Sequence, residues 1–231
     1  MPINRITAGT IDKPPSLREQ VSISLRAALT TGEMQQGVTY SIPQLAEKFG
    51  VSATPVREAI LDLIKEGLLV ALPNKGFRIV DTSEEMLQKI TEIRLLIEIP
   101  TTVKIAEIIT QEKIDEFREL ALYIQVLAEK SDWVPFIEHD RTFHHKILEV
   151  SGNEPLVEYA DQLRSQTRIH GLPYLIESGR LISSSLEHLT LLDAMEKKDF
   201  DVVAATVRQH INYTIEAINA KLIKSNGKRF A

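Results

Sequence analysis

The 231-residue sequence predicts a mainly α-helical protein in two parts. We expect an N-terminal unit with one β-hairpin and a C-terminal bundle of about six helices. Apolar residues recur at helical spacing through most of the chain, and Ser or Thr followed three residues later by Glu or Gln marks several helix starts. Alternating strand-like runs flank only one turn signal, at residues 73–76. The expected segments are a flexible arm (1–14), the N-terminal unit (15–81), the bundle (82–224) and a frayed tail (225–231).

The composition is typical of a soluble globular protein, with 43% hydrophobic and 26% charged residues. There is no cysteine, and no apolar run approaches the ~20 residues of a membrane span. We therefore expect a cytoplasmic protein with no membrane partner. The net charge of -5 divides into +2 over residues 1–80 and -7 over residues 81–231. This asymmetry favours contact with nucleic acid through the N-terminal part alone.

The first two helices begin at capping pairs. Ser16 with Glu19 starts the first helix, and Ser41 with Gln44 starts a shorter second one that stops at Gly50. In each pair the hydroxyl accepts a bond from the backbone three residues on, while the longer side chain returns a bond to the cap residue. These pairs predict two short helices before residue 50.

A third helix and a hairpin complete the N-terminal unit. Ser52 or Thr54 caps the helix, which tolerates Pro55 in its first turn and ends at Gly67. Two β-like runs, residues 68–71 and 77–80, then flank a basic turn. Helix, short turn, helix and basic hairpin together predict a winged helix-turn-helix.

In that arrangement the N-terminal residues of the second helix of the motif enter the major groove of double-stranded DNA. Arg57 suits a bidentate contact with guanine or a phosphate, although a surface ion pair with Glu58 or Asp62 is an alternative. Capping alone would also explain Gln44. The predicted DNA-binding residues are Gln44, Ser52, Thr54, Arg57, Lys75 and Gly76.

The sequence after residue 81 predicts a series of helices. Thr82 with Glu85 starts a long helix to about residue 109, and a second covers about 111–129. Asp132 caps a third. A fourth begins at Pro155 and is expected to stop before residues 171–173. A fifth covers about 183–197, and Asp199 caps a sixth.

Four residues of this bundle suit one divalent metal ion. Asp140 and His144 are i and i+4, so they share a helix face. His188 and His210 each lie 11 residues from Asp199, which places them at one level of an antiparallel helix pair. Hydrogen-bonded core histidines and a surface Asp–His pair are the alternatives. The predicted ligands suit zinc, nickel, manganese or cobalt.

The segments GVSATPVREAI (residues 50–60), EGLL (66–69) and NKGFRIV (74–80) resemble the DNA-binding domain of the GntR family of bacterial transcription regulators. The resemblance covers residues 16–80. Ala53 stands where the family usually has an arginine that contacts DNA. This departure leaves Arg57 as the chief candidate for specific contact.

DRTFHH, LEHLTLLDAM and RQHI resemble the helical effector domain, called FCD, of the FadR-type branch of that family, over residues 85–215. All four metal positions are present, which implies the metal-binding kind rather than the kind that binds acyl thioesters. The resemblance implies a homodimer on a palindromic operator and a small organic acid effector at the metal. It also implies effector contacts from Arg94, in TEIRLLIE, and from Asn153. Arg164, Arg168 and Tyr174 are further candidates for the cavity wall.

The sequence therefore predicts a DNA-binding transcription regulator controlled by a small carboxylate at a divalent metal ion. A DNA-binding protein with a purely structural metal is one alternative. A metal-dependent enzyme is another. The P-loop and Gly-x-Ser-x-Gly patterns are missing from the sequence, so we expect no enzymatic activity.

Overall fold

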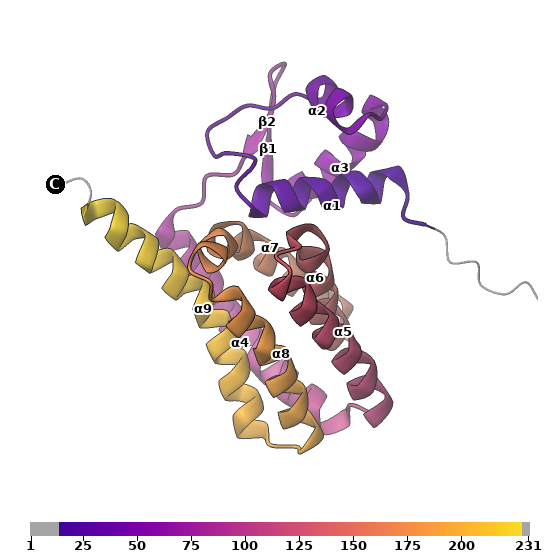
Figure 1. Ribbon diagram of the computed structural model, residues 1–231, viewed down its shortest axis with the longest axis vertical. Helices are drawn as coiled ribbons and strands as arrows, with labels where there is room; N and C mark the ends of the chain where they lie inside the picture. Colours follow the sequence, from indigo (N-terminus) through magenta and orange to yellow (C-terminus); the bar gives the residue numbers. More distant parts are fainter. Residues whose placement is uncertain (1–13, 228–231) are drawn as a thin grey trace, which may run out of the picture.

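The computed structural model describes residues 14–227, so nearly all of the expected arm and the last four residues of the expected tail lie outside it. The described chain is mainly α-helical, which confirms the predicted fold class, and an N-terminal unit stands on one end of a helical bundle (Figure 1). The N-terminal unit consists of α1 (Leu17–Thr30), α2 (Ile42–Phe49), α3 (Ala53–Lys65), β1 (Leu69–Leu72) and β2 (Gly76–Ile79). The bundle consists of α4 (Glu84–Ile108), α5 (Gln111–Glu129), α6 (Trp133–Glu149), α7 (Glu154–Glu177), α8 (Leu181–Glu196) and α9 (Phe200–Gly227).

Local capping explains where the first helices start. Ser16 and Glu19 form both bonds of the predicted capping box. At α2 only half of the box forms, because the Ser41 hydroxyl accepts from the Gln44 backbone but donates to the Gln44 side-chain oxygen. Gly50 ends α2 with a φ of 65°. Short polar motifs therefore set where α1 and α2 begin.

The core of the N-terminal unit lies between its three helices and the hairpin. β1 and β2 are antiparallel, with Leu69 opposite Ile79 and Leu72 opposite Gly76. Phe77 of β2 is fully buried with apolar side chains of α1 and α3. Burial of such side chains is worth about 1.5–3 kcal/mol each, so this small unit depends on the hairpin as well as the helices.

Two predicted features of the bundle are wrong. The helix after the linker is capped by Ser83, not Thr82, because the Ser83 hydroxyl accepts from the Met86 backbone and the helix begins at Glu84. Helix α7 does not stop before residue 171 but continues through Pro173 to Glu177. Buried Leu172 and Leu175 hold that stretch in the core, which outweighs the backbone bond that proline removes.

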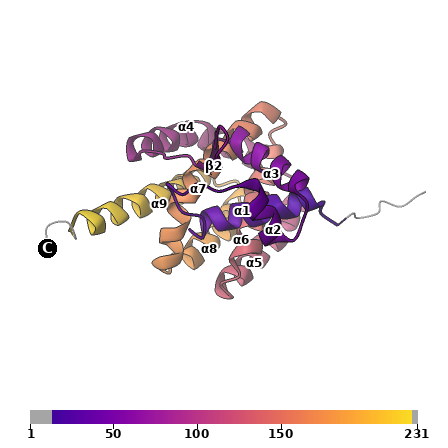
Figure 2. The same cartoon turned by 90° about the horizontal axis from the view of Figure 1, so that it is seen from above.

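The two parts of the chain touch. Helix α1 lies across the ends of α6 and α7, as the two orthogonal views show (Figures 1 and 2). Ala27 of α1 belongs to the apolar core of the bundle, while Ile169 of α7 packs against the core of the N-terminal unit. The N-terminal unit is thus seated on α6 and α7 by side chains from both parts.

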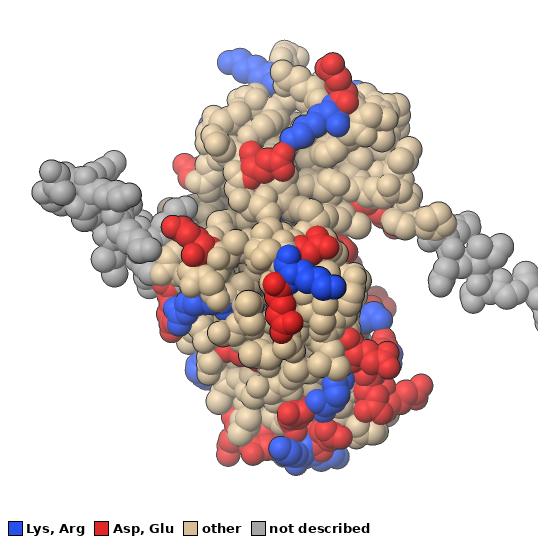
Figure 3. Space-filling model, viewed as in Figure 1, with Lys and Arg blue, Asp and Glu red and all other residues tan. Residues whose placement is uncertain are grey.

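Charged side chains are unevenly spread on the face shown in Figure 3. They gather toward the lower end of the bundle, far from the N-terminal unit.

Within residues 14–227, none of the helices combines the length and the apolar character needed to cross a membrane.

Candidate functional site

The N-terminal end of α3 presents polar side chains to solvent. Ser52 is its cap residue, yet the Ser52 hydroxyl makes no capping bond to the helix. Ser52, Thr54 and Arg57 are all exposed. Asp62, one of the two predicted partners of Arg57, is instead paired with Arg18 at 2.6 Å. Among the described residues Arg57 forms no ion pair, so its guanidinium is available to a ligand.

The other predicted DNA-binding residues flank this helix. Gln44 is exposed in the first turn of α2, with its side-chain oxygen bonded to Ser41 at 2.9 Å. Lys75 is exposed at the tip of the hairpin. Its neighbour Asn74 has a φ of 59°, which shapes the turn. Helix end and hairpin tip together form the candidate DNA-binding surface.

Gly76 has an internal role that its prediction as a DNA contact missed. Its φ is 113°, and a Cβ atom there would lie 2.1 Å from the Tyr40 carbonyl oxygen. Tyr40 and Phe77 form a backbone bridge that ties the α1–α2 loop to β2. Glycine is needed at 76 so that these two segments can meet.

We predict that Gly76→Ala destabilises the N-terminal unit by about 1–3 kcal/mol, because alanine combines an unfavourable φ with this backbone collision. Urea unfolding of the purified protein measures the loss. Gly37→Ala is the matched control, since Gly37 also has a positive φ of 79° but open space around the missing Cβ. Equal losses in the two variants would contradict the role of the Tyr40 contact.

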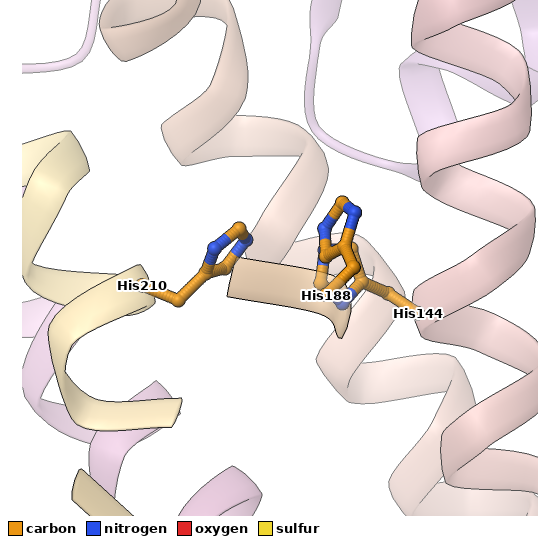
Figure 4. A group of neighbouring side chains, drawn as sticks. All are labelled: His144, His188 and His210. Atoms are coloured by element: carbon orange, nitrogen blue, oxygen red, sulfur yellow. The ribbon is translucent and has the colours of Figure 1, made fainter. Parts of the chain in front are cut away.

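Three histidines from different helices converge inside the bundle. His144 comes from α6, His188 from α8 and His210 from α9 (Figure 4). One nitrogen of each ring lies within 4.8 Å of the others, and the His144 and His188 Nε2 atoms are 3.2 Å apart. The first two rings are buried and the third is half-buried. His188 and His210 are predicted to lie at the same level of an antiparallel helix pair, and their ring centroids are 5.2 Å apart.

Asp140 completes the group. Its Oδ1 atom lies 3.3 Å from His188 Nε2 and 3.8 Å from His144 Nε2, and its Oδ2 atom accepts a hydrogen bond from Arg168. The structure therefore brings all four predicted ligands together. His145 lies outside the group, where its Nδ1 pairs with Asp161 at 2.5 Å.

The electrostatics of the group suit a cation. Burial lowers the pKa of His188 to about 3, although the Asp140 carboxylate opposes the shift. Burial also holds the pKa of His144 well below its usual value, and the nearby Arg164 guanidinium adds to this. Burial alone would raise the pKa of Asp140, but the surrounding positive charge, with the Arg168 guanidinium first, outweighs it and lowers the pKa. At neutral pH these two imidazoles are uncharged and the carboxylate is ionised, which is the state in which they bind metals.

The donor set fits a divalent transition metal. Imidazole nitrogens suit zinc and nickel, and a carboxylate extends the choice to manganese and cobalt. The Nδ1 atom of His188 is buried without a hydrogen-bond partner among the described residues. By contrast, His210 Nδ1 lies 2.9 Å from Glu187 Oε2, so the other ring nitrogen remains for a ligand. Sequence reasoning missed Glu187, whose only signal was its place one residue before His188.

A cavity adjoins the histidines on the side of α4 and α7. Arg94, predicted to hold the effector, is buried there and donates to Glu98 at 2.8 Å and to Thr167 at 2.9 Å. Arg94 therefore pairs with Glu98 on its own helix and still lines the cavity in which its effector contact is expected. Arg164 and Arg168 also line the cavity, whereas Tyr174 packs against the bundle core. Three guanidinium groups thus face one small space beside the candidate metal site.

The structure does not bring Asn153 to this cavity. Asn153 is the cap residue of α7, where its side chain accepts from the Leu156 backbone at 3.3 Å. It borders a separate surface depression with Thr101 and Lys104. The residues lining the cavity beside the histidines do not include it. Its position after α6 is explained by helix capping, and its predicted contact with an effector has no support from this geometry.

Comparison with known proteins defines the class of protein to which this chain belongs. Residues 17–79 match the family model of bacterial regulatory proteins of the gntR family, and residues 89–213 match the FCD domain. The chain belongs to the GntR family of transcription regulators and carries an FCD domain. It binds DNA through its helix-turn-helix unit, and its family contains regulators rather than enzymes.

Individual relatives agree with this class. The chain is 31% identical to the HTH-type transcriptional regulator McbR of Escherichia coli K12 over 189 residues, which is 81% of this chain and 86% of McbR. It is 26% identical to an uncharacterised HTH-type regulator, YdhC of Bacillus subtilis, across 94% of this chain and 97% of YdhC. The solved structure of E. coli McbR/YncC superposes with a TM-score of 0.74 at 28% identity, covering 90% of this chain and all of that one.

Proposed function

We propose that this transcription regulator senses a small carboxylate bound at a divalent metal ion, and that binding alters its affinity for an operator. The observation that carries the proposal is the meeting of Asp140 and three histidines beside a cavity lined by guanidinium groups. Asp140, His144, His188 and His210 would hold the ion, which would offer open coordination positions to a carboxylate. Arg94 would hold the same ligand by bidentate hydrogen bonds.

Counting charges supports an anionic effector. The ionised groups around the site are three guanidiniums and three carboxylates, from Arg94, Arg164, Arg168, Glu98, Asp140 and Glu187. These charges balance in the metal-binding state, because imidazoles that bind a metal are neutral. A divalent ion would leave an excess of two positive charges in a largely buried space. Uncompensated buried charge is costly, and a dicarboxylate would offset it.

The proposal includes a homodimer on a palindromic operator. A single α3 helix reads one half-site, and two-fold symmetry matches two such helices to two half-sites. Support for a dimer surface comes from α4, which exposes large apolar side chains to solvent. Ile93 is 46% exposed and Leu96, one turn on, is 69% exposed. Exposed apolar patches on soluble proteins often mark contacts with another protein chain.

A purely structural metal is the competing function. The candidate ligands tie together α6, α8 and α9, so an ion there would also cross-link the bundle. The two functions differ in what a carboxylate does. A sensor gains stability from the acid, and a structural centre does not.

Thermal unfolding of metal-loaded protein against a panel of small mono-, di- and tricarboxylates tests the proposal. We expect one class of acid to raise the midpoint. At about 100 times its dissociation constant a ligand contributes about 2.7 kcal/mol. For a chain of this size that corresponds to roughly 5–10 °C. The matched control is the uncharged amide of each active acid, which should give no shift.

Two further outcomes are informative. If no acid shifts the midpoint while chelation lowers it strongly, the structural-metal function is favoured. If an acid that stabilises the protein leaves operator binding unchanged in a gel-shift titration, carboxylate sensing of the kind proposed is contradicted.

A further inference from the structure

Helix α7 contacts the end of α3 with two side chains spaced one turn apart. Gln162 Nε2 donates to the Lys65 carbonyl at 3.4 Å, and Gln166 Nε2 donates to the Glu66 carbonyl at 3.1 Å. Both carbonyls belong to the last turn of α3, where backbone acceptors run out of partners within the helix. The two amides therefore hold the end of α3 opposite to its candidate DNA-binding end.

The fit around this contact is close. Gly67, directly after the end of α3, has a φ of 75°, and a Cβ there would lie 2.8 Å from Gln166 Nε2. Farther along α7, Ile169 packs against the apolar core of the N-terminal unit. The contact is therefore a packed interface. Helix α7 contacts the C-terminal end of α3 and also the apolar core of the N-terminal unit.

The opposite side of the same stretch of α7 holds the cavity. Thr167, next to Gln166, accepts from Arg94 at 2.9 Å. Arg164 pairs with Glu98, and Arg168 pairs with Asp140. Within two turns, α7 therefore binds the candidate effector site on one side and the end of α3 on the other.

We propose that Gln162 and Gln166 are positioning residues that make the orientation of α3 depend on the state of the cavity. This rests on the proposed function of that cavity. A cation bound at the histidines competes with Arg168 for the Asp140 carboxylate. An anion in the cavity would pair with Arg164 and Arg168. Binding of either ion therefore changes the forces on α7. Arg57 lies roughly 12 Å along α3 from Lys65, so a small tilt at the held end moves its side chain.

The first test measures whether the two glutamines hold α3. Amide hydrogen exchange of residues 66–68 is followed in metal-free protein, because these amides donate to the last turn of α3. In Gln162→Ala/Gln166→Ala we expect exchange there to be about 2- to 10-fold faster for each hydrogen bond lost. Gln125→Ala, on α5, is the matched control and should leave these amides unchanged. Equal rates in the double variant and the wild type would overturn the proposal.

The second test measures coupling from the site. Asp140→Asn removes the charged partner of Arg168 without any metal, and Zn²⁺ alone is the second input. Each should change exchange at residues 66–68 in the wild-type background and have little effect in Gln162→Ala/Gln166→Ala. An Asp140→Asn effect of the same size in both backgrounds would overturn the proposal.

Elemental analysis of the same samples separates this inference from the metal site. If the wild-type protein retains no Zn²⁺, the metal site fails, yet the comparison of Asp140→Asn between the two backgrounds still decides the role of the glutamines. If Zn²⁺ is retained and the double variant responds to it like the wild type, the glutamines are not the coupling residues.

Discussion

Replacing His188 and His210 together by alanine is expected to abolish metal retention. The wild-type chain should keep one divalent ion, whereas the variant retains only Asp140 and His144 from the group. Two donors on adjacent turns of one helix do not form a closed site for a transition metal. Zinc at about 100 times its dissociation constant should stabilise the wild type by about 2.7 kcal/mol, or roughly 5–10 °C, and should not stabilise the variant. Elemental analysis after gel filtration and thermal unfolding with added Zn²⁺ measure both effects.

His139→Ala is the matched control for this loss. His139 is also on α6, but its ring meets Tyr123 edge-on at a centroid distance of 4.9 Å and lies outside the group. It should leave metal content unchanged. A full equivalent of metal in the His188→Ala/His210→Ala protein would show that the ion is held elsewhere.

Arg57→Ala is expected to weaken specific DNA binding by about 1–3 kcal/mol, or roughly 5- to 150-fold. Arg57 is exposed in the first turns of α3 and forms no ion pair with a described residue, so its loss should leave the fold intact. Fluorescence anisotropy with a duplex selected by the wild-type protein from a random-sequence pool measures the affinity. Repeating the titration over a range of salt concentrations distinguishes the kind of contact. Loss of a phosphate contact lowers the salt slope by about one, whereas loss of a base contact leaves it unchanged.

Arg208→Ala is the control for charge. It removes the same charge from an exposed position on α9, within the bundle. Only Arg57→Ala should reduce specific binding. Equal affinity of the Arg57→Ala protein and the wild type would remove Arg57 from the interface.

Helix α7 shows where sequence reasoning fails. Residues 171–173, Gly-Leu-Pro, are a reasonable stop signal by local propensity, and the helix nevertheless continues to Glu177. Burial of Leu172 and Leu175 decides this, and burial depends on partners far away in the chain. Asn153 illustrates the reverse case. Its local role as the cap of α7 is sufficient to explain its position, and its predicted effector contact came only from resemblance.

The candidate metal site shows where sequence reasoning succeeds. An i, i+4 pair and two histidines equally far from a helix break are geometric statements about ideal helices. Helices α6, α8 and α9 follow that geometry, so His144, His188 and His210 meet as expected. Glu187 was missed because its partner, His210, is on the next helix, and nothing in the spacing pointed to a bond between them.

Short-range rules in the sequence by themselves determined the class of this protein: a winged helix-turn-helix followed by helices that carry a His and Asp group. Helical period, capping pairs and turn residues act over a few positions, so they can be recognised in the sequence without knowledge of the fold. Only the tertiary structure decided that α7 contacts both the cavity and the end of α3, and that Arg168 donates to Asp140. It also decided that position 76 must be glycine, because the Tyr40 carbonyl lies against it. Each of these depends on the packing of segments distant in sequence, which capping pairs and turn residues do not specify.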